Sequence, residues 1–329
     1  DSDERQEADA MSGPTRKQLV ERWEDACTPE MLLAPSPFGL VDGREDFRGY
    51  HWQGKLGDYG MPAEGFLPEG QVIDNVDLSY AEINPFQARH LTLSNCYAKQ
   101  AKILVASWTH GSVTACEFER CTVKDGMPWL GVTVADCVFR ACKFPEVFAW
   151  GARYDNCQAI DMRLKGPVGG GLNNPVLTNV TVSGKWKECS LEETVEGDQL
   201  VGCDFSEVEF GIAGFDYVDM HKVKIPAELQ RLTVLNWEDI RGRVVELVGE
   251  LRESSSQGEE AFSQSSLALE YMEIDFRGQH DEAPRPRGAR YCLELDAWAG
   301  WGHSHNYLLE LYRDAGAEFM RDPFEESED

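Results

Sequence analysis

Apolar side chains recur with a period of five residues through the middle of the chain. Val76 and Leu78 form a first pair, two positions apart, and nine more pairs follow without a break as far as Cys121 and Val123. The residue inside each pair is polar or can form a hydrogen bond. A period of five fits neither an α-helix nor an extended strand, whose side chains return to one face every 3.6 and 2 residues.

The pattern resumes after two interruptions. One residue is inserted near 124–126, and eight further pairs then run to Met162 and Leu164. A loop rich in Gly, Pro and Asn follows at 166–175, and Pro226 ends the repeat. Between this loop and Pro226 the pairs are Val180/Val182, Cys189/Leu191, Cys203/Phe205, Val208/Phe210, Ala213/Phe215, Val218/Met220 and Val223/Ile225.

A chain that turns a corner every five residues explains the period. Four sides make a coil of about 20 residues, and stacked coils must supply the core because one side is too short to bury anything alone. We therefore predict a mainly β, four-sided β-solenoid. Its coils should align two columns of side chains: Cys96, Cys116, Cys137 and Cys157, and Ile83, Ile103, Val123, Phe144 and Leu164.

The repeat resembles that of the pentapeptide-repeat family, whose unit is Ala-Asp/Asn-Leu-x-x. The best matches are Val76-Asp77-Leu78, Cys203-Asp204-Phe205 and Val218-Asp219-Met220, and Cys often stands in place of Ala. The resemblance covers about 150 residues and implies a right-handed quadrilateral β-helix. Such a fold alone says little about function.

Both flanks differ from the repeat. Residues 1–70 predict a cap with one helix over 15–27, which Thr15 can cap and whose apolar face holds Leu19, Val20, Trp23 and Cys27. The cap also contains Asp46-Phe47-Arg48-Gly49, which we interpret as an irregular early repeat; the same tetrapeptide recurs at 275–278, where we assign it no role. The solenoid itself is assigned to 71–225, with a loop insertion at 165–176.

Residues 226–329 predict a mainly helical C-terminal region. Helices are expected at 236–253, 259–274 and 306–315, a strand at 290–295 and an acidic tail at 325–329. This region either caps the open end of the solenoid or binds a partner, which includes a second copy in a homodimer.

Ten cysteines raise the possibility of a metal or disulfide framework. Eight of them occupy the small position of the repeat, where cysteine acts as a buried apolar residue, and their spacings of five differ from those of zinc ligands. Free thiols favour a cytoplasmic location. His303 and His305 offer at most half a metal site, and Gly169–Gly171 lacks the signature of a phosphate loop. We predict no metal, cofactor or catalytic residue.

The charge is unevenly distributed. The chain has a formal net charge of −27, of which residues 70–165 contribute 0 and residues 166–329 contribute −19. This acidity argues against direct binding to nucleic acid or anionic lipid, and no apolar run reaches the roughly 20 residues that span a bilayer. We expect a macromolecular partner, most simply a basic protein.

The sequence therefore favours a non-enzymatic binding protein with an acidic surface. Its candidate partner-binding residues are Glu192, Glu193, Glu196, Asp204, Glu207 and Glu209. Two alternatives have the same chemistry: mimicry of duplex DNA that protects a type II topoisomerase, as the resemblance implies, and neutralisation of a basic toxin by an immunity protein. A carbohydrate-active enzyme is the least favoured, because such β-helices usually have three sides and longer coils.

Overall fold

The structure is a computed structural model that describes residues 14–23, 27–54, 67–124, 127–143, 152–164, 175–192, 200–216, 220–231, 233–254, 290–291 and 305–322. It divides into two compact units, Asp1–Leu164 and Lys165–Asp329. Each unit is described by itself.

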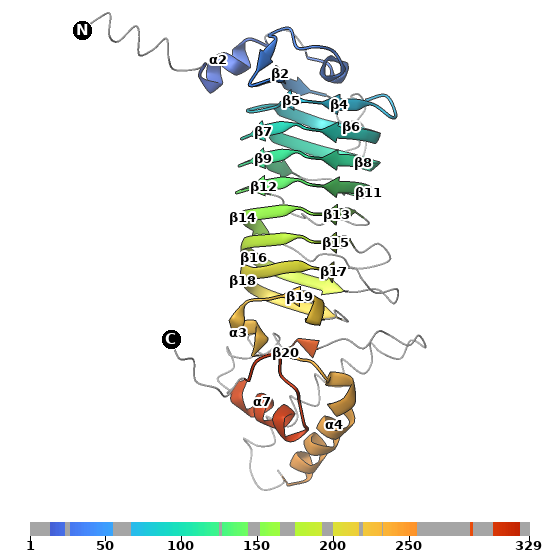
Figure 1. The fold of residues 1–329 in the computed structure, drawn as a ribbon, viewed down its shortest axis with the longest axis vertical. Coiled ribbons are helices and arrows are strands. Elements are labelled where there is room, and N and C mark those ends of the chain that lie inside the picture. Colours follow the sequence, from blue (N-terminus) through green and yellow to red (C-terminus); the bar gives the residue numbers. More distant parts are fainter. Residues whose placement is uncertain are drawn as a thin grey trace, which may run out of the picture. The chain divides into compact units, whose positions relative to one another are not determined.

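In the first unit, short parallel strands stack into two ladders (Figure 1). One ladder contains β5 (Val76–Asp77), β7 (Tyr97–Lys99), β9 (Glu117–Glu119), β12 (Val138–Arg140) and β14 (Gln158–Leu164). The other contains β3 (His51–Gln53), β4 (Val72–Asp74), β6 (Glu82–Ser94), β8 (Lys102–Thr114), β10 (Thr122–Lys124), β11 (Met127–Ala135) and β13 (Arg153–Asp155).

The register between strands confirms the predicted coil. Tyr97 lies beside Glu117, Glu117 beside Val138, and Val138 beside Gln158, so successive coils contain 20, 21 and 20 residues. The residue before each of these four is a buried cysteine, which confirms the cysteine column. Ile83, Ile103 and Val123 are likewise in register. Phe144 lies outside the described residues.

Residues in the left-handed region of backbone conformation mark the corners of the coils in three columns. One corner column contains Asn75, Asn95, Ala115, Asp136 and Asn156, all with φ between 52° and 56°. A second contains Tyr80, Gln100, Arg120, Ala141 and Asp161, and a third contains His90, His110 and Gly131. A positive φ turns the chain sharply inside one residue, and Asn, Asp and Gly tolerate it best. The corners are therefore the physical origin of the five-residue period.

Helix α2 (Arg16–Glu21) begins where the sequence predicts and ends earlier. The Thr15 side chain accepts a hydrogen bond from the Gln18 N–H and the Gln18 side chain caps Thr15 in return. Arg22 is the C-cap of the helix, and its guanidinium reaches Asp46. The shorter helix is followed by the 3₁₀ helix η1 (Pro29–Leu33), and strands β1 (Leu40–Val41) and β2 (Arg44–Asp46) form an antiparallel hairpin.

The second unit contains longer coils of the same kind. Strands β15 (Val176–Thr178) and β17 (Leu200–Val201) pair in parallel, as do β16 (Thr181–Glu192), β18 (Cys203–Asp216) and β19 (Val223–Lys224). Trp186 lies beside Phe210 in register and is buried, although the repeat pattern did not identify it. The weak repeats at 180–191 therefore belong to a regular pair of strands.

A small helical core follows the last strand. Helix α4 (Trp237–Ser254) packs against α7 (His305–Asp314), close to the predicted helices, and β20 (Thr233–Val234) pairs with β21 (Arg290–Tyr291). The 3₁₀ helix η3 (Met220–Lys222) lies between β18 and β19, and the short helix α3 (Ala227–Gln230) lies between β19 and β20. The buried residues of this core are Val234, Ile240, Val244, Leu309, Leu311 and Tyr312. The predicted helix at 259–274 lies outside the described residues. Within the described part of the chain, no helix is long and apolar enough to cross a membrane.

Candidate interaction surface

The predicted acidic residues lie on β16, on β18 and in the segment between them. Asp204, Glu207 and Glu209 belong to β18, and Glu192 is the last residue of β16. Glu193 and Glu196 are outside the described residues, as is the side chain of Glu192. The structure therefore brings three of the six residues onto one strand.

Asp204 is engaged in local contacts. Its carboxylate accepts hydrogen bonds from the Ser206 N–H at 3.0 Å and hydroxyl at 2.5 Å, and it pairs with Lys224 at 3.0 Å. Partial burial opposes its ionisation, but these donors outweigh that effect and lower the pKa of the carboxyl. Asp204 is thus charged at neutral pH and already neutralised by a neighbour.

Glu207 and Glu209 point outward on either side of buried Val208. Glu209 forms an ion pair with Lys185 on β16 at 2.6 Å, and both side chains are about two-thirds exposed. Glu207 is exposed and forms no ion pair with any described residue. An exposed pair of this kind contributes little to stability and can be exchanged for a partner's charge.

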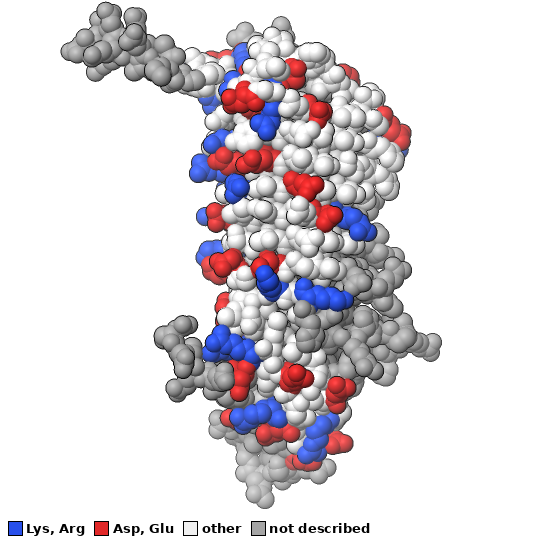
Figure 2. Space-filling view, in the orientation of Figure 1, with Lys and Arg blue, Asp and Glu red and all other residues white. Residues whose placement is uncertain are grey.

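The first unit neutralises its charges in a ladder across the coils. Lys99 pairs with Glu119 at 3.1 Å, Arg140 with Glu117 at 3.6 Å, and Lys102 with Glu82 at 3.3 Å. Figure 2 shows blue and red side chains next to one another over β7, β9 and β12. The zero net charge predicted for these coils is therefore partly local, because Glu82, Glu117 and Glu119 each lie beside a base.

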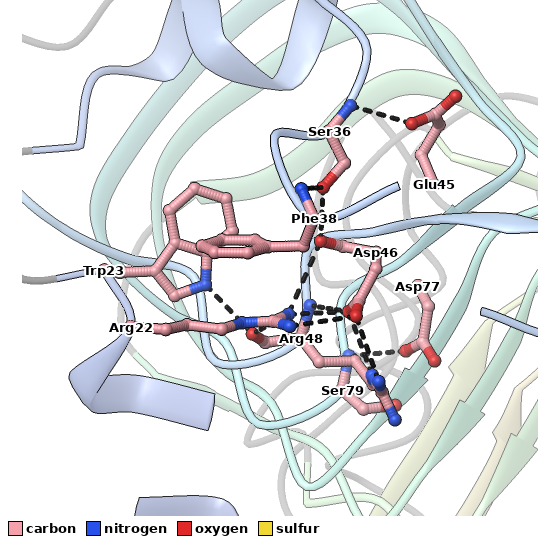
Figure 3. Close-up of polar contacts among 9 residues, drawn as sticks. All are labelled: Arg22, Trp23, Ser36, Phe38, Glu45, Asp46, Arg48, Asp77 and Ser79. Carbon is pink, nitrogen blue, oxygen red and sulfur yellow. Dashed lines mark hydrogen bonds and ion pairs between the residues drawn. The ribbon is translucent and has the colours of Figure 1, made fainter. Parts of the chain in front are cut away.

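A buried polar cluster lies at the N-terminal end of the first unit (Figure 3). The Asp46 carboxylate accepts hydrogen bonds from Arg22, at 2.6 and 2.9 Å, and from the side chain of Arg48, at 2.9 Å through each oxygen. The Trp23 indole N–H donates to the Arg48 carbonyl at 2.9 Å, and the Arg22 guanidinium lies 4.0 Å from the Phe38 ring centre.

Burial opposes the ionisation of Asp46, but hydrogen bonds from Arg22 and Arg48 outweigh it and hold the pKa of this carboxyl well below its usual range. The sequence predicts an irregular early repeat at Asp46 to Gly49, and Asp46 lies in register with Asp77 of the first regular repeat. The structure shows that α2 and the residues directly after it pack against this tetrapeptide. The feature of the sequence that could have indicated this contact is the pair Arg22-Trp23 near the end of an amphipathic helix.

The cysteine columns contain free, buried thiols. Free and buried cysteines among the described residues are Cys27, Cys96, Cys116, Cys121, Cys137, Cys142, Cys157 and Cys203. Each described thiol of the repeat lies within hydrogen-bonding distance of the carbonyl two residues before it and of a carbonyl in the preceding coil, as Cys137 does with Ala135 at 3.1 Å and Val113 at 3.5 Å. The side chain of Cys189 lies outside the described residues. Burial raises the pKa of Cys203 to about 11. Cysteine therefore adds a weak donor where alanine has none.

The structure tests a metal site only among the residues that it describes. Among the described residues, no group of three or more His, Cys, Asp or Glu side chains is arranged to hold a metal ion. His303 and Gly169–Gly171 lie outside the described residues, as does the side chain of His305.

No protein-family model matches the chain, and no curated protein matches it. Among solved structures it is similar to HetL, a pentapeptide repeat protein involved in heterocyst differentiation regulation from the cyanobacterium Nostoc sp. strain PCC 7120. The similarity covers 56% of this chain and 86% of HetL, at 13% sequence identity and a TM-score of 0.26. At that score the match adds no argument to the coil geometry, which itself shows the fold of a pentapeptide-repeat protein.

Proposed function

We propose that the chain is a non-enzymatic scaffold that presents the acidic strand β18 to a basic macromolecular partner. The observation that supports this best is Glu207, an exposed acid on β18 with no ion pair to any described residue, two positions from Glu209, whose ion pair with Lys185 is exposed and exchangeable. The strand fixes their spacing, so a partner binds them without ordering a flexible loop. The charge of −19 over residues 166–329 would steer a basic surface toward this unit.

The charge ladder of the first unit supports the same choice of surface. Glu82 and Glu117 each have a basic neighbour in the next coil, whereas Glu207 has none among the described residues. Paired charges of opposite sign cancel within a few ångströms, and only the uncancelled ones act at the distances over which two proteins approach. DNA mimicry requires acidity along the whole rod, and the first unit does not provide it.

The experiment begins with affinity purification on the full chain, followed by association kinetics with the basic protein recovered. Glu207→Lys with Glu209→Lys should slow association at least tenfold at low salt, and the difference should shrink as salt is added. Glu82→Lys with Glu117→Lys, a matched double reversal in the first unit, should change the rate much less.

A partner whose binding ignores salt and the β18 reversal, but is lost with the first-unit reversal, would overturn the proposal. Recovery of only acidic or uncharged partners would do the same. Circular dichroism of each variant separates loss of binding from loss of fold.

A further inference from the structure

We propose that the face formed by β16, β18 and β19 binds a folded protein that presents a row of basic side chains bordered by acidic ones, and that it discriminates against uniform polycations. The residue that sets this specificity is Lys187. The inference rests on the proposed function and adds to it the charge pattern that the partner must have.

The acids of β18 lie between lysines of the two neighbouring strands. On one side, Lys224 of β19 is in register with Asp204 and pairs with it at 3.0 Å. On the other side, Lys185 of β16 is in register with Glu209 and pairs with it at 2.6 Å. The charged side chains that the structure describes on these strands are three acids and three bases, namely Asp204, Glu207, Glu209, Lys185, Lys187 and Lys224.

Lys187 is the one base among these six that has no acid beside it. Trp186 is buried between Lys185 and Lys187, so both lysines project outward. Trp186 lies beside Phe210, which places Lys187 opposite Gly211. Lys187 is exposed and forms no ion pair with any described residue. It is therefore an uncancelled base on the strand next to the uncancelled acid of β18.

The pattern of this face acts at contact and not at a distance. Adjacent strands lie about 4.8 Å apart, which is less than the Debye length of about 8 Å at physiological salt. An approaching protein therefore responds to the summed charge, −19 over residues 166–329, which steers it toward the unit. Once in contact, it meets the individual side chains, and a base held against Lys187 is repelled.

A uniform polycation does not satisfy this face. Its charges can pair with Glu207 and displace Lys185 from Glu209, but they then lie against Lys187 and the released Lys185. A surface with basic side chains in one row and acidic ones beside it pairs with all four. Repulsion of the wrong partner is a common source of specificity. The strands hold these charges at fixed spacing, so a folded partner with its own fixed spacing fits them at the lowest entropic cost.

A charge swap in the full chain tests the inference. Lys187→Glu makes the face more acidic, whereas Lys187→Glu with Glu207→Lys exchanges the two uncancelled charges and leaves the net charge unchanged. Lys143→Glu is the matched control, because Lys143 is an exposed lysine of the first unit that also forms no ion pair with any described residue. Dissociation constants are measured against poly-L-lysine and against the basic protein recovered by affinity purification.

The two probes should order the variants differently. Poly-L-lysine should bind Lys187→Glu and Lys143→Glu more tightly than the wild type, because both variants gain negative charge, and it should bind the swap like the wild type. The recovered protein should bind Lys187→Glu and the swap roughly tenfold more weakly than the wild type at physiological salt. Lys143→Glu should change that affinity by less than about twofold.

Unchanged or tighter binding of Lys187→Glu to the recovered protein would overturn the inference, because only net charge would then matter. A swap that binds this protein like the wild type would do the same. If Glu207→Lys with Glu209→Lys has no effect, the proposed function itself fails, so the two failures are distinguishable. Circular dichroism of each variant separates weaker binding from loss of fold.

Discussion

Gly49 lies so close beneath Leu19 that a Cβ built on the glycine would collide with the Leu19 carbonyl oxygen. The backbone of α2 thus rests directly on the backbone of the first coil. Gly49 also has φ 72°, a conformation that side chains disfavour. No other residue type satisfies both conditions at this position.

Gly49→Ala should therefore destabilise the cap by about 2–4 kcal/mol, from steric displacement of α2 together with backbone strain. Gly39→Ala is the matched control, since Gly39 has φ 75° and open space around its Cα. It should cost only about 1 kcal/mol. Urea unfolding of both variants gives the comparison, and equal losses would show that the close approach to Leu19 is unimportant.

Asp46 should link stability of the cap to pH. Its pKa is lowered in the folded state, so its contribution is complete above the unfolded value of about 4 and is lost as the pH falls below it. Wild type and Asp46→Asn should differ most at neutral pH and converge toward pH 2–3. Thermal melts across this range test the sign, and a gap that widens on acidification would contradict it.

Ala115 occupies a corner where φ is 52°, between Asn95 and Asp136 in the same column. An alanine in this conformation is strained by roughly 1 kcal/mol, whereas asparagine tolerates it. Ala115→Asn should raise stability by about 0.5–1 kcal/mol, and its amide could join the contact already made by Asn156 with Asp136. Ala135→Asn, at a strand position, should give no gain. Denaturant midpoints of the two variants decide the matter.

Phe118 and Glu117 are adjacent, but substitutions at the two positions should change stability by very different amounts. Phe118 is buried and stacks on Phe139 with ring centres 5.2 Å apart, so Phe118→Asp should unfold the coils at a cost above about 3 kcal/mol. Glu117 is half exposed beside Arg140, and Glu117→Ala should change stability by less than about 0.5–1 kcal/mol. Thermal melts that shift equally would place Phe118 outside the core.

The buried cysteines should be unreactive until the chain unfolds. A thiol reagent added to native protein should label few of the eight buried cysteines, whereas denaturation without reductant should expose them all as free thiols. Two results would contradict this assignment: rapid labelling of most of them in the native state, or their absence after denaturation.

The repeat made the coil predictable because its cause is local. Each five-residue side points one pair of apolar side chains inward, as Val76 and Leu78 do, so the period is visible in the sequence as soon as several sides follow one another. Trp186 was missed because coils in the second unit are longer and the period is lost between corners. The contact between the α2 segment and residues 46–49 was not predicted, for another reason. Arg22 and Asp46 are 24 residues apart and follow no period, and only the folded backbone brings them together.

The sequence predicted which part of the chain is acidic, but not which acidic side chains form ion pairs. Net charge is a sum over sequence, whereas neutralisation depends on which residues face each other across strands. Lys185 and Glu209 are 24 residues apart, a separation that the five-residue period does not predict. Glu207 remains uncancelled among the described residues only because Ser183 stands opposite it.

The register of the coils also has a mechanical consequence. The backbone hydrogen bonds between β7, β9 and β12 join one coil to the next, and therefore lie along the direction in which the coils stack. A pulling force applied in that direction would load them one coil at a time rather than all together in shear. The first unit should then extend in small steps at low force, and each step would release roughly 70 Å of chain.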